Sequence, residues 1–155
     1  MFNPDRHMSD EDAVQVVLNG RYGVLSTASK EGEPYGVAVN YVYVPGDNAL
    51  YFHCQLKGRK ISNMKENDRV SLFVIGREEI VPERFITHYE SAIVTGRASF
   101  ISDKAEKREK ILMICNKFAP NSLERRDAVI DKYIATFYIC KIDIESITGK
   151  RNNDY

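Results

Sequence analysis

The sequence predicts an α+β fold that is mainly β, in which six or seven antiparallel strands form a barrel or sheet with flanking helices. Most strand patterns precede the longer helical patterns, and this order argues against a doubly wound α/β fold. The first three strands are joined by short turns, whereas parallel neighbours would need crossovers of a dozen or more residues. The 155 residues suit a single domain, with mobile ends expected at residues 1–8 and 150–155.

The strands are recognised by β-branched and aromatic residues that recur with a period of two, between polar turns rich in glycine and proline. Such turns are expected at 29–33 and 45–48. The run at 85–101 is long enough for one bent strand or two, and Gly96 within it indicates a bulge or kink. The expected strands cover residues 24–28, 35–44, 50–54, 69–75, 85–101 and 137–144.

Three or four helices are expected beside the strands. The first begins after Ser9, shows apolar residues on one face, and is stopped by Gly20. A later helix begins at Asp103, which together with Glu106 forms a capping pattern, and it ends near Pro120. A short helix is expected within 58–66, and a last one over 123–135.

Composition excludes several classes of function. The 22 Lys and Arg residues balance the 22 Asp and Glu residues, so no large field of one sign favours nucleic acid or an anionic membrane surface. The first residues lack the apolar stretch of a signal peptide, and no run approaches the ~20 apolar residues of a membrane span. We therefore expect a cytoplasmic protein with no nucleic-acid or membrane partner.

The three cysteines and three histidines do not form a metal or disulfide pattern. Cys54, Cys115 and Cys140 are far apart in the sequence and include no C-x-x-C pair. Free cysteine behaves as a small hydrophobe, so these residues are expected to be buried thiols. No ligand spacing links the histidines, and no bound metal is expected.

The basic segment Lys57-Gly58-Arg59-Lys60 is the most unusual feature of the chain. It lies where an expected strand ends and an expected helix begins, so an anion there would meet free backbone N–H groups, the helix dipole and flexible cationic side chains. This arrangement predicts a phosphate site. A solvated basic turn explains the same local pattern equally well.

Several segments, read together, resemble the pyridoxamine 5'-phosphate oxidase-like FMN-binding split barrels, in particular their nitroimidazole-resistance branch. The likeness runs from about residue 6 to residue 149 in the right order and spacing. The segments that carry it are Arg21-Tyr22-Gly23-Val24-Leu25-Ser26-Thr27, residues 34–43, Leu50-Tyr51-Phe52-His53, Lys57-Gly58-Arg59-Lys60-Ile61, Asn67-Asp68-Arg69-Val70 and residues 90–98.

The resemblance implies a split β-barrel, FMN as the cofactor, and a homodimer with the flavin site at the subunit interface. Arg59 and Lys60 match the paired cations on the FMN phosphate, and Lys57 and Gly58 line the same turn. Val39, Asn40 and Tyr41 match the strand that faces the isoalloxazine ring, and His53 and Cys54 match the strand end beside it. Tyr89, Glu90 and Ser91 match a strand that reaches the flavin in the dimeric site.

His53 is the candidate catalytic residue. A lone histidine on a barrel strand is more often a hydrogen-bonded wall residue. The resemblance implies, however, that the histidine of this Tyr-Phe-His segment can sit at the substrate face of the flavin. An imidazole that titrates near neutrality suits proton donation or substrate orientation, and the structural role stays open as the alternative.

The resemblance implies an FMN-dependent oxidoreductase that takes electrons from NAD(P)H or another reductant. Its acceptor would be a small molecule such as a nitroaromatic or nitroimidazole ring. Two alternatives stay open: a flavin-binding carrier or sensor without turnover, and a pyridoxamine-phosphate oxidase. The oxidase is disfavoured because the sequence shows no obvious second set of cations for another phosphate. Analogy of fold does not determine activity, so the expectation is firmest for the cofactor.

Overall fold

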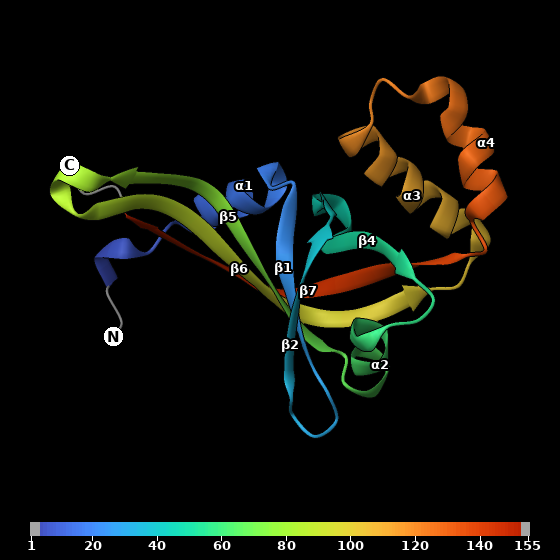
Figure 1. Cartoon of the computed structure of the whole chain (residues 1–155), viewed down its shortest axis with the longest axis horizontal. Helices are drawn as coiled ribbons and strands as arrows, with labels where there is room; N and C mark the ends of the chain where they lie inside the picture. Colours follow the sequence, from blue (N-terminus) through green and yellow to red (C-terminus); the bar gives the residue numbers. More distant parts are fainter. Residues whose placement is uncertain (1–3, 153–155) are drawn as a thin grey trace.

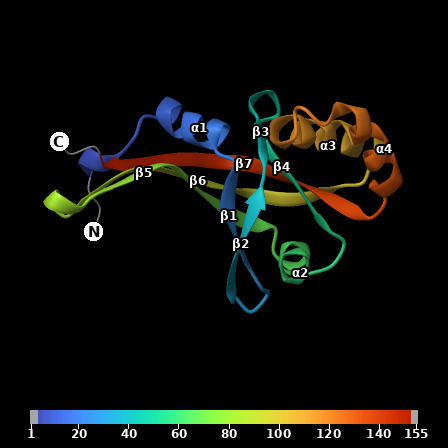
Figure 2. The same cartoon turned by 45° about the horizontal axis from the view of Figure 1, so that its top comes forward.

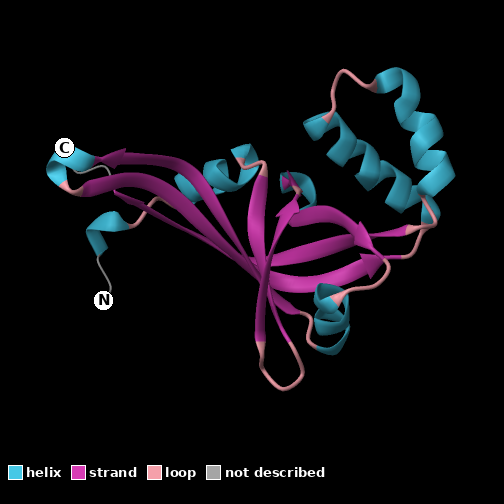
Figure 3. Cartoon of the chain, viewed as in Figure 1, coloured by secondary structure: helices cyan, strands magenta, loops and turns pink. Residues whose placement is uncertain are grey.

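The computed structural model describes residues 4–152, which form seven strands, four α-helices and three short 3-10 helices. Strands predominate in Figure 3, as the sequence predicted. The strands are β1 (Tyr22–Ala28), β2 (Pro34–Asn40), β3 (Val42–Val44), β4 (Ala49–Gln55), β5 (Arg69–Val81), β6 (Ile86–Ile101) and β7 (Phe137–Asn152). The helices are α1 (Asp10–Asn19), α2 (Arg59–Glu66), α3 (Lys104–Phe118) and α4 (Leu123–Tyr133).

The strands form one antiparallel sheet in the order β2-β1-β5-β6-β7-β4-β3. Its two edge strands, β2 and β3, are separated in sequence only by Tyr41, so residues 34–44 join both edges and close the sheet into a barrel (Figure 1). The single strand expected at 35–44 is therefore wrong, because it divides at this residue. Tyr41 is fully buried, and its hydroxyl donates a hydrogen bond to the Val17 carbonyl of α1 (2.6 Å).

Two strands are much longer than their sequence patterns indicated. β5 continues from Ile75 to Val81 and pairs with β6, and β7 runs beyond Ile144 to Asn152. These extensions form an arm that projects from the barrel, with the Pro82–Arg84 turn at its tip (Figures 1 and 2). The β5 extension is exposed on both faces, so no alternation marks it; backbone pairing defines it instead.

The bulge expected at Gly96 is confirmed. The register between β6 and β7 shifts between Thr95 and Gly96. A Cβ atom at Gly96 would collide with the Asp143 carbonyl oxygen, so only glycine permits this close approach of the two backbones. The bend allows the 16-residue strand β6 to serve both the barrel and the arm.

The hydrophobic residues form two clusters on opposite faces of the sheet. The larger one fills the barrel and includes Leu25, Phe52 and Val74. The smaller one packs α3 and α4 against the outer side of β4 and β7, with Tyr51 and Ile139 at its centre. Strands β4 and β7 therefore carry buried residues on both faces, which explains the nearly continuous apolar pattern at residues 49–52.

The two expected helix caps are confirmed. Ser9 Oγ accepts from the Asp12 amide (3.2 Å), and the Asp103 carboxylate accepts from the Glu106 amide (2.8 Å). Helix α4 ends at Tyr133, two residues earlier than expected, because a turn follows in which the Thr136 amide donates to the Tyr133 carbonyl (2.8 Å). None of the helices within residues 4–152 is both long and apolar enough to cross a membrane.

The chain ends are more structured than expected over the described residues. His7 forms a bridge with Lys150, and the Met8 amide donates to the Gly149 carbonyl (3.2 Å). Residues 4–8 and 150–152 were expected to be mobile. In the structure they take part in backbone pairing or in a 3-10 turn. Their outer parts, residues 1–3 and 153–155, lie outside the described residues.

Candidate functional site

The basic turn leads directly into helix α2 and leaves its start without a side-chain cap. Gly58 occupies the N-cap position with φ 141°, a backbone conformation that L side chains rarely adopt. The first turn of α2 carries no acidic residue, whereas α1 and α3 have both a capping side chain and acidic residues there. The start of α2 is therefore an electropositive backbone end that no protein side chain caps.

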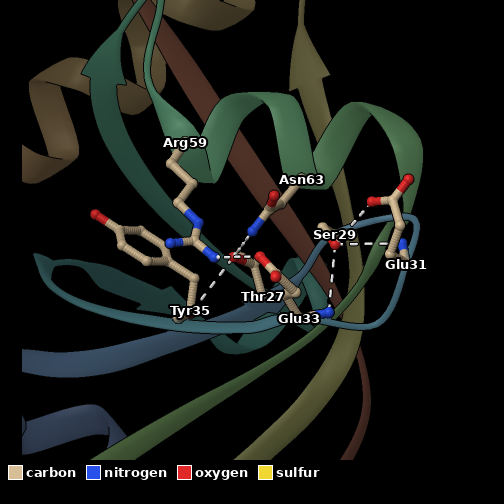
Figure 4. Close-up of polar contacts among 7 residues, drawn as sticks. All are labelled: Thr27, Ser29, Glu31, Glu33, Tyr35, Arg59 and Asn63. Carbon is tan, nitrogen blue, oxygen red and sulfur yellow. Dashed lines mark hydrogen bonds and ion pairs between the residues drawn. The ribbon is translucent and has the colours of Figure 1, made fainter.

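The two cations that follow Gly58 face different neighbours. The Arg59 guanidinium lies 3.2 Å from the Glu33 carboxylate and 4.9 Å from the centroid of the Tyr35 ring, both on the β1–β2 hairpin (Figure 4). Lys60 lies close enough to His53 and Cys54 for its charge to lower the pKa of each. The structure thus separates the pair: one cation contacts the hairpin, and the other faces the end of β4.

A buried polar contact fixes α2 against the barrel. Asn63 and Thr27 are both buried, and the Asn63 Nδ2 group donates to Thr27 Oγ1 (2.9 Å). The Thr27 hydroxyl in turn donates to the Tyr35 carbonyl at a longer 3.4 Å (Figure 4). Because buried polar groups are costly without partners, this chain of bonds sets the position of α2, and so of Arg59, relative to the hairpin.

His53 lies at the end of β4 with its side chain exposed on the outer face. Its ring meets the Phe137 ring edge-on, with 6.1 Å between the centroids. Desolvation by the flanking side chains lowers the pKa of His53, and the charge of Lys60 lowers it further. The lowered pKa favours the neutral imidazole, which can both donate and accept a hydrogen bond.

Cys54 and Cys140 are buried thiols, as expected, whereas Cys115 is half-buried; all three are free. Burial raises the pKa of Cys54 to about 11, despite the opposing charge of Lys60. The Cys54 side chain packs inside the barrel, which leaves only its backbone to face the outer surface. Within residues 4–152, no group of three or more His, Cys, Asp or Glu side chains could hold a metal ion.

The segment predicted to face the flavin ring forms the junction between β2 and β3. Val39 and Tyr41 point into the barrel core, and burial raises the pKa of Tyr41. Asn40 points outward, where its Nδ2 group donates to the Arg21 carbonyl (3.1 Å). Asn40 is therefore the one residue of these three whose side chain reaches the outer surface.

Tyr89, Glu90 and Ser91 lie on the arm, away from α2. Figures 1 and 2 both show the arm and α2 on opposite sides of the β1–β2 hairpin. The three residues line a groove of about 570 Å³ between the arm strands, together with Ile75 and Lys150. Within one subunit, the structure therefore does not bring them to the basic turn.

The outer face of β1, β5 and β6 carries exposed apolar residues. Val24 pairs with Phe73, which pairs with Ile93, so these three side chains form a row across three strands. Ile75, with 59% exposure, extends the row toward the arm. A second groove of about 950 Å³ opens beside it, between α1 and strands β1 and β5. Both grooves are lined by Ile75 and lie apart from the basic turn.

Sequence reasoning missed the residues that surround Arg59. The sequence pattern indicates only a polar turn at Glu33 and only a strand at Tyr35. Thr27 and Asn63 have no local pattern that distinguishes them from solvent-exposed polar residues. The only available signal was the position of Asn63 on the inward face of α2, next to the buried Met64.

The closed antiparallel barrel, with flanking helices and a basic strand-to-helix turn, defines the class of the protein as a split β-barrel. The chain belongs to the pyridoxamine 5'-phosphate oxidase family, whose family model matches residues 9–151. This confirms the family indicated by the sequence motifs. No curated protein matches the chain.

Solved structures with this fold come from proteins with different ligands. A candidate 5-nitroimidazole antibiotic resistance protein from Bacteroides thetaiotaomicron is 22% identical, with a TM-score of 0.78 over 94% of this chain and 86% of its own. An FAD-binding protein from Mesorhizobium loti is 25% identical, with a TM-score of 0.69 over 96% of this chain and 98% of its own. The heme storage protein HutZ from Vibrio cholerae is 16% identical, with a TM-score of 0.68 over 93% and 96% of the two chains.

Proposed function

We propose that this protein is an FMN-dependent oxidoreductase that works as a homodimer. The observation that carries this proposal is the start of α2, where three cations lie beside a helix end that no side chain caps. The barrel that bears this turn belongs to the pyridoxamine 5'-phosphate oxidase family. A phosphate monoester fits these residues, because it can accept from backbone N–H groups and pair with cationic side chains.

In this proposal, different residues would hold the phosphate and the ring of the cofactor. Lys57, Gly58, Arg59 and Lys60 would bind the phosphate, and the φ of Gly58 lets the backbone adopt the sharp turn there. The isoalloxazine ring would lie against the backbone of the β2–β3 junction and the end of β4, contacting Val39, Asn40, Tyr41, His53 and Cys54. FMN supplies the redox chemistry when it is bound, and the protein supplies binding, orientation and electrostatics.

A second copy of the chain would complete the site. Tyr89, Glu90 and Ser91 belong to the arm part of β6, and the arm and α2 lie on opposite sides of the hairpin, so in this proposal the three residues reach the flavin of the partner. The exposed row of Val24, Phe73 and Ile93 offers a self-complementary apolar surface for a two-fold contact. Burial of this row between two subunits would place the flavin at the interface.

His53 would act on the substrate rather than on the phosphate. Its neutral imidazole stands on the outer face at the end of β4, close to Lys60, where it can donate a hydrogen bond to a small acceptor. Replacing His53 with Gln retains a hydrogen-bond donor but removes the titration. We expect this variant to keep bound flavin and to turn over more slowly, without the acid-side pH dependence that the titration of His53 would give wild type.

The likeness to the candidate nitroimidazole resistance protein supports a nitroaromatic or similar small molecule as the electron acceptor. NAD(P)H is the proposed electron donor, and the cytoplasm is the proposed compartment. A flavin-binding carrier or sensor, the principal alternative, would share the cofactor site and differ only in turnover. The pyridoxamine-phosphate oxidase reaction would release pyridoxal phosphate from its amine precursor, which makes it directly distinguishable.

Two measurements test the proposal: flavin binding by wild type and a double variant, and then electron transfer by wild type. The absorbance spectrum of purified protein should show flavin bands, and replacing Arg59 and Lys60 together with Ala should abolish FMN retention while the fold persists by circular dichroism. Under anaerobic conditions NADPH or NADH should bleach the flavin, and a nitroimidazole should restore the oxidised spectrum. Flavin that binds but is never reduced would support the carrier, and a protein that rejects micromolar FMN would refute both functions.

A further inference from the structure

Arg59 is already engaged by an internal anion. Its Nη2 atom lies 3.2 Å from Glu33 Oε2, and its guanidinium stacks over the Tyr35 ring at 4.9 Å from the centroid (Figure 4). Glu33 and Tyr35 both belong to the β1–β2 hairpin, whereas Arg59 begins α2. A carboxylate therefore occupies one side of the cation that the proposed function assigns to the cofactor phosphate.

The hairpin turn holds the backbone of Glu33 in place. The Ser29 amide donates to the Glu33 carbonyl (3.0 Å), and the Glu33 amide donates to Ser29 Oγ (3.3 Å). Gly32, with φ 89°, makes the tight turn between them. On the opposite side, the Asn63–Thr27 bond fixes α2. Both partners of the ion pair thus stand on anchored backbone, so the fold places their two side chains within reach of each other.

The ion pair remains open to exchange with a dissolved anion. The side chains of Arg59 and Glu33 are 50% and 73% exposed, and pairs with such exposure are weak because water screens them. A phosphate dianion carries more charge than a carboxylate and can also accept from the uncapped start of α2. It is therefore the stronger partner for Arg59 where the two compete.

We propose that Glu33 is an internal counter-ion of Arg59 that the phosphate group of the cofactor displaces, so that Glu33 sets the affinity of the site for phosphate-bearing flavins. This inference rests on the proposed function. Tyr35 keeps the guanidinium beside the turn during the exchange, because the cation–π contact does not require the carboxylate. Glu33 is thereby a specificity-determining residue: it weakens the binding of FMN and leaves riboflavin, which lacks the phosphate, unaffected.

The test compares Glu33→Gln with wild type and with Glu31→Gln. Glu31 is the matched control because it lies in the same turn and loses the same charge, yet its carboxylate accepts from Ser29 Oγ (3.1 Å) on the far side from Arg59 (Figure 4). The dissociation constants of FMN and of riboflavin are measured for each apoprotein by flavin fluorescence. Loss of an exposed competing ion pair should tighten FMN binding by about two- to five-fold in Glu33→Gln.

Riboflavin binding should stay unchanged in both variants, and Glu31→Gln should bind FMN like wild type. Equal or weaker FMN binding by Glu33→Gln would overturn the inference, as would an equal gain in Glu31→Gln or an equal gain for riboflavin. These outcomes are separate from the fate of the proposed function, whose cofactor assignment fails when wild type itself does not bind FMN and whose turnover fails when the bound flavin is never reduced. Unfolding curves for the three proteins verify that the variants are folded.

Discussion

The bond between Asn63 and Thr27 is expected to contribute to stability as a coupled unit. Both side chains are only 4% exposed, and 2.9 Å separates Asn63 Nδ2 from Thr27 Oγ1. Removing one partner of a buried hydrogen bond leaves the other unsatisfied, which costs about 1–3 kcal/mol. Asn63→Leu keeps the volume but leaves Thr27 with only its long 3.4 Å contact to Tyr35. Thr27→Val leaves the Asn63 amide without this acceptor.

The double variant Thr27→Val/Asn63→Leu replaces both polar partners with apolar groups of similar shape, which is close to neutral in favourable cases. We therefore expect each single variant to lose about 1–3 kcal/mol and the double variant to lose less than their sum, with a coupling of at least about 1 kcal/mol. Urea unfolding of the four apoproteins at one protein concentration, with equal m-values, measures this cycle. Additive losses within about 0.5 kcal/mol would refute the reasoning.

Three further predictions concern other parts of the molecule. Gly58→Ala forces an alanine into φ 141° and should weaken FMN binding at least ten-fold. The control variant Gly46→Ala, in another exposed turn, should leave the FMN dissociation constant unchanged. Ile75→Glu places a charge on the 59% exposed apolar face and should convert the proposed homodimer to a monomer in analytical ultracentrifugation, whereas Val129→Glu on α4 should not. Asp47→Asn removes the carboxylate that pairs with the buried Lys110 (2.8 Å) and should destabilise the fold at neutral pH.

The pH dependence of the Asp47 effect follows from its pKa. Hydrogen bonds from Lys110 and from Tyr51 lower the pKa of Asp47 below its ordinary value of 3.8. Its stabilising contribution is therefore fully present above the unfolded pKa and is lost as the pH falls through the lower folded value. The stability difference between wild type and Asp47→Asn should be constant between about pH 5 and 8 and should shrink below about pH 4. A difference that grows on acidification contradicts this assignment, and Asp143→Asn serves as the exposed control.

Local sequence patterns predicted most of the secondary structure and the chemistry of the basic turn. Alternation of apolar residues marks the barrel strands because each has one face in the core, and Ser9 and Asp103 mark helix starts because caps act over three residues. The four-residue segment from Lys57 to Lys60 needed only its own composition and its place between a strand and a helix to indicate an anion site. The order and spacing of the motifs likewise identified the family.

The tertiary structure alone decided how these parts meet. The arm strands beyond Ile75 follow from backbone pairing and not from alternation, so no local pattern encodes them. Tyr41, at which the expected strand divides, bonds to Val17, 24 residues away in the chain. Arg59 meets Glu33 only because the closed barrel brings α2 against the β1–β2 hairpin, across 26 residues of sequence. Periodicity records which face of an element is buried; the identity of the neighbour across a contact depends on how the whole chain closes.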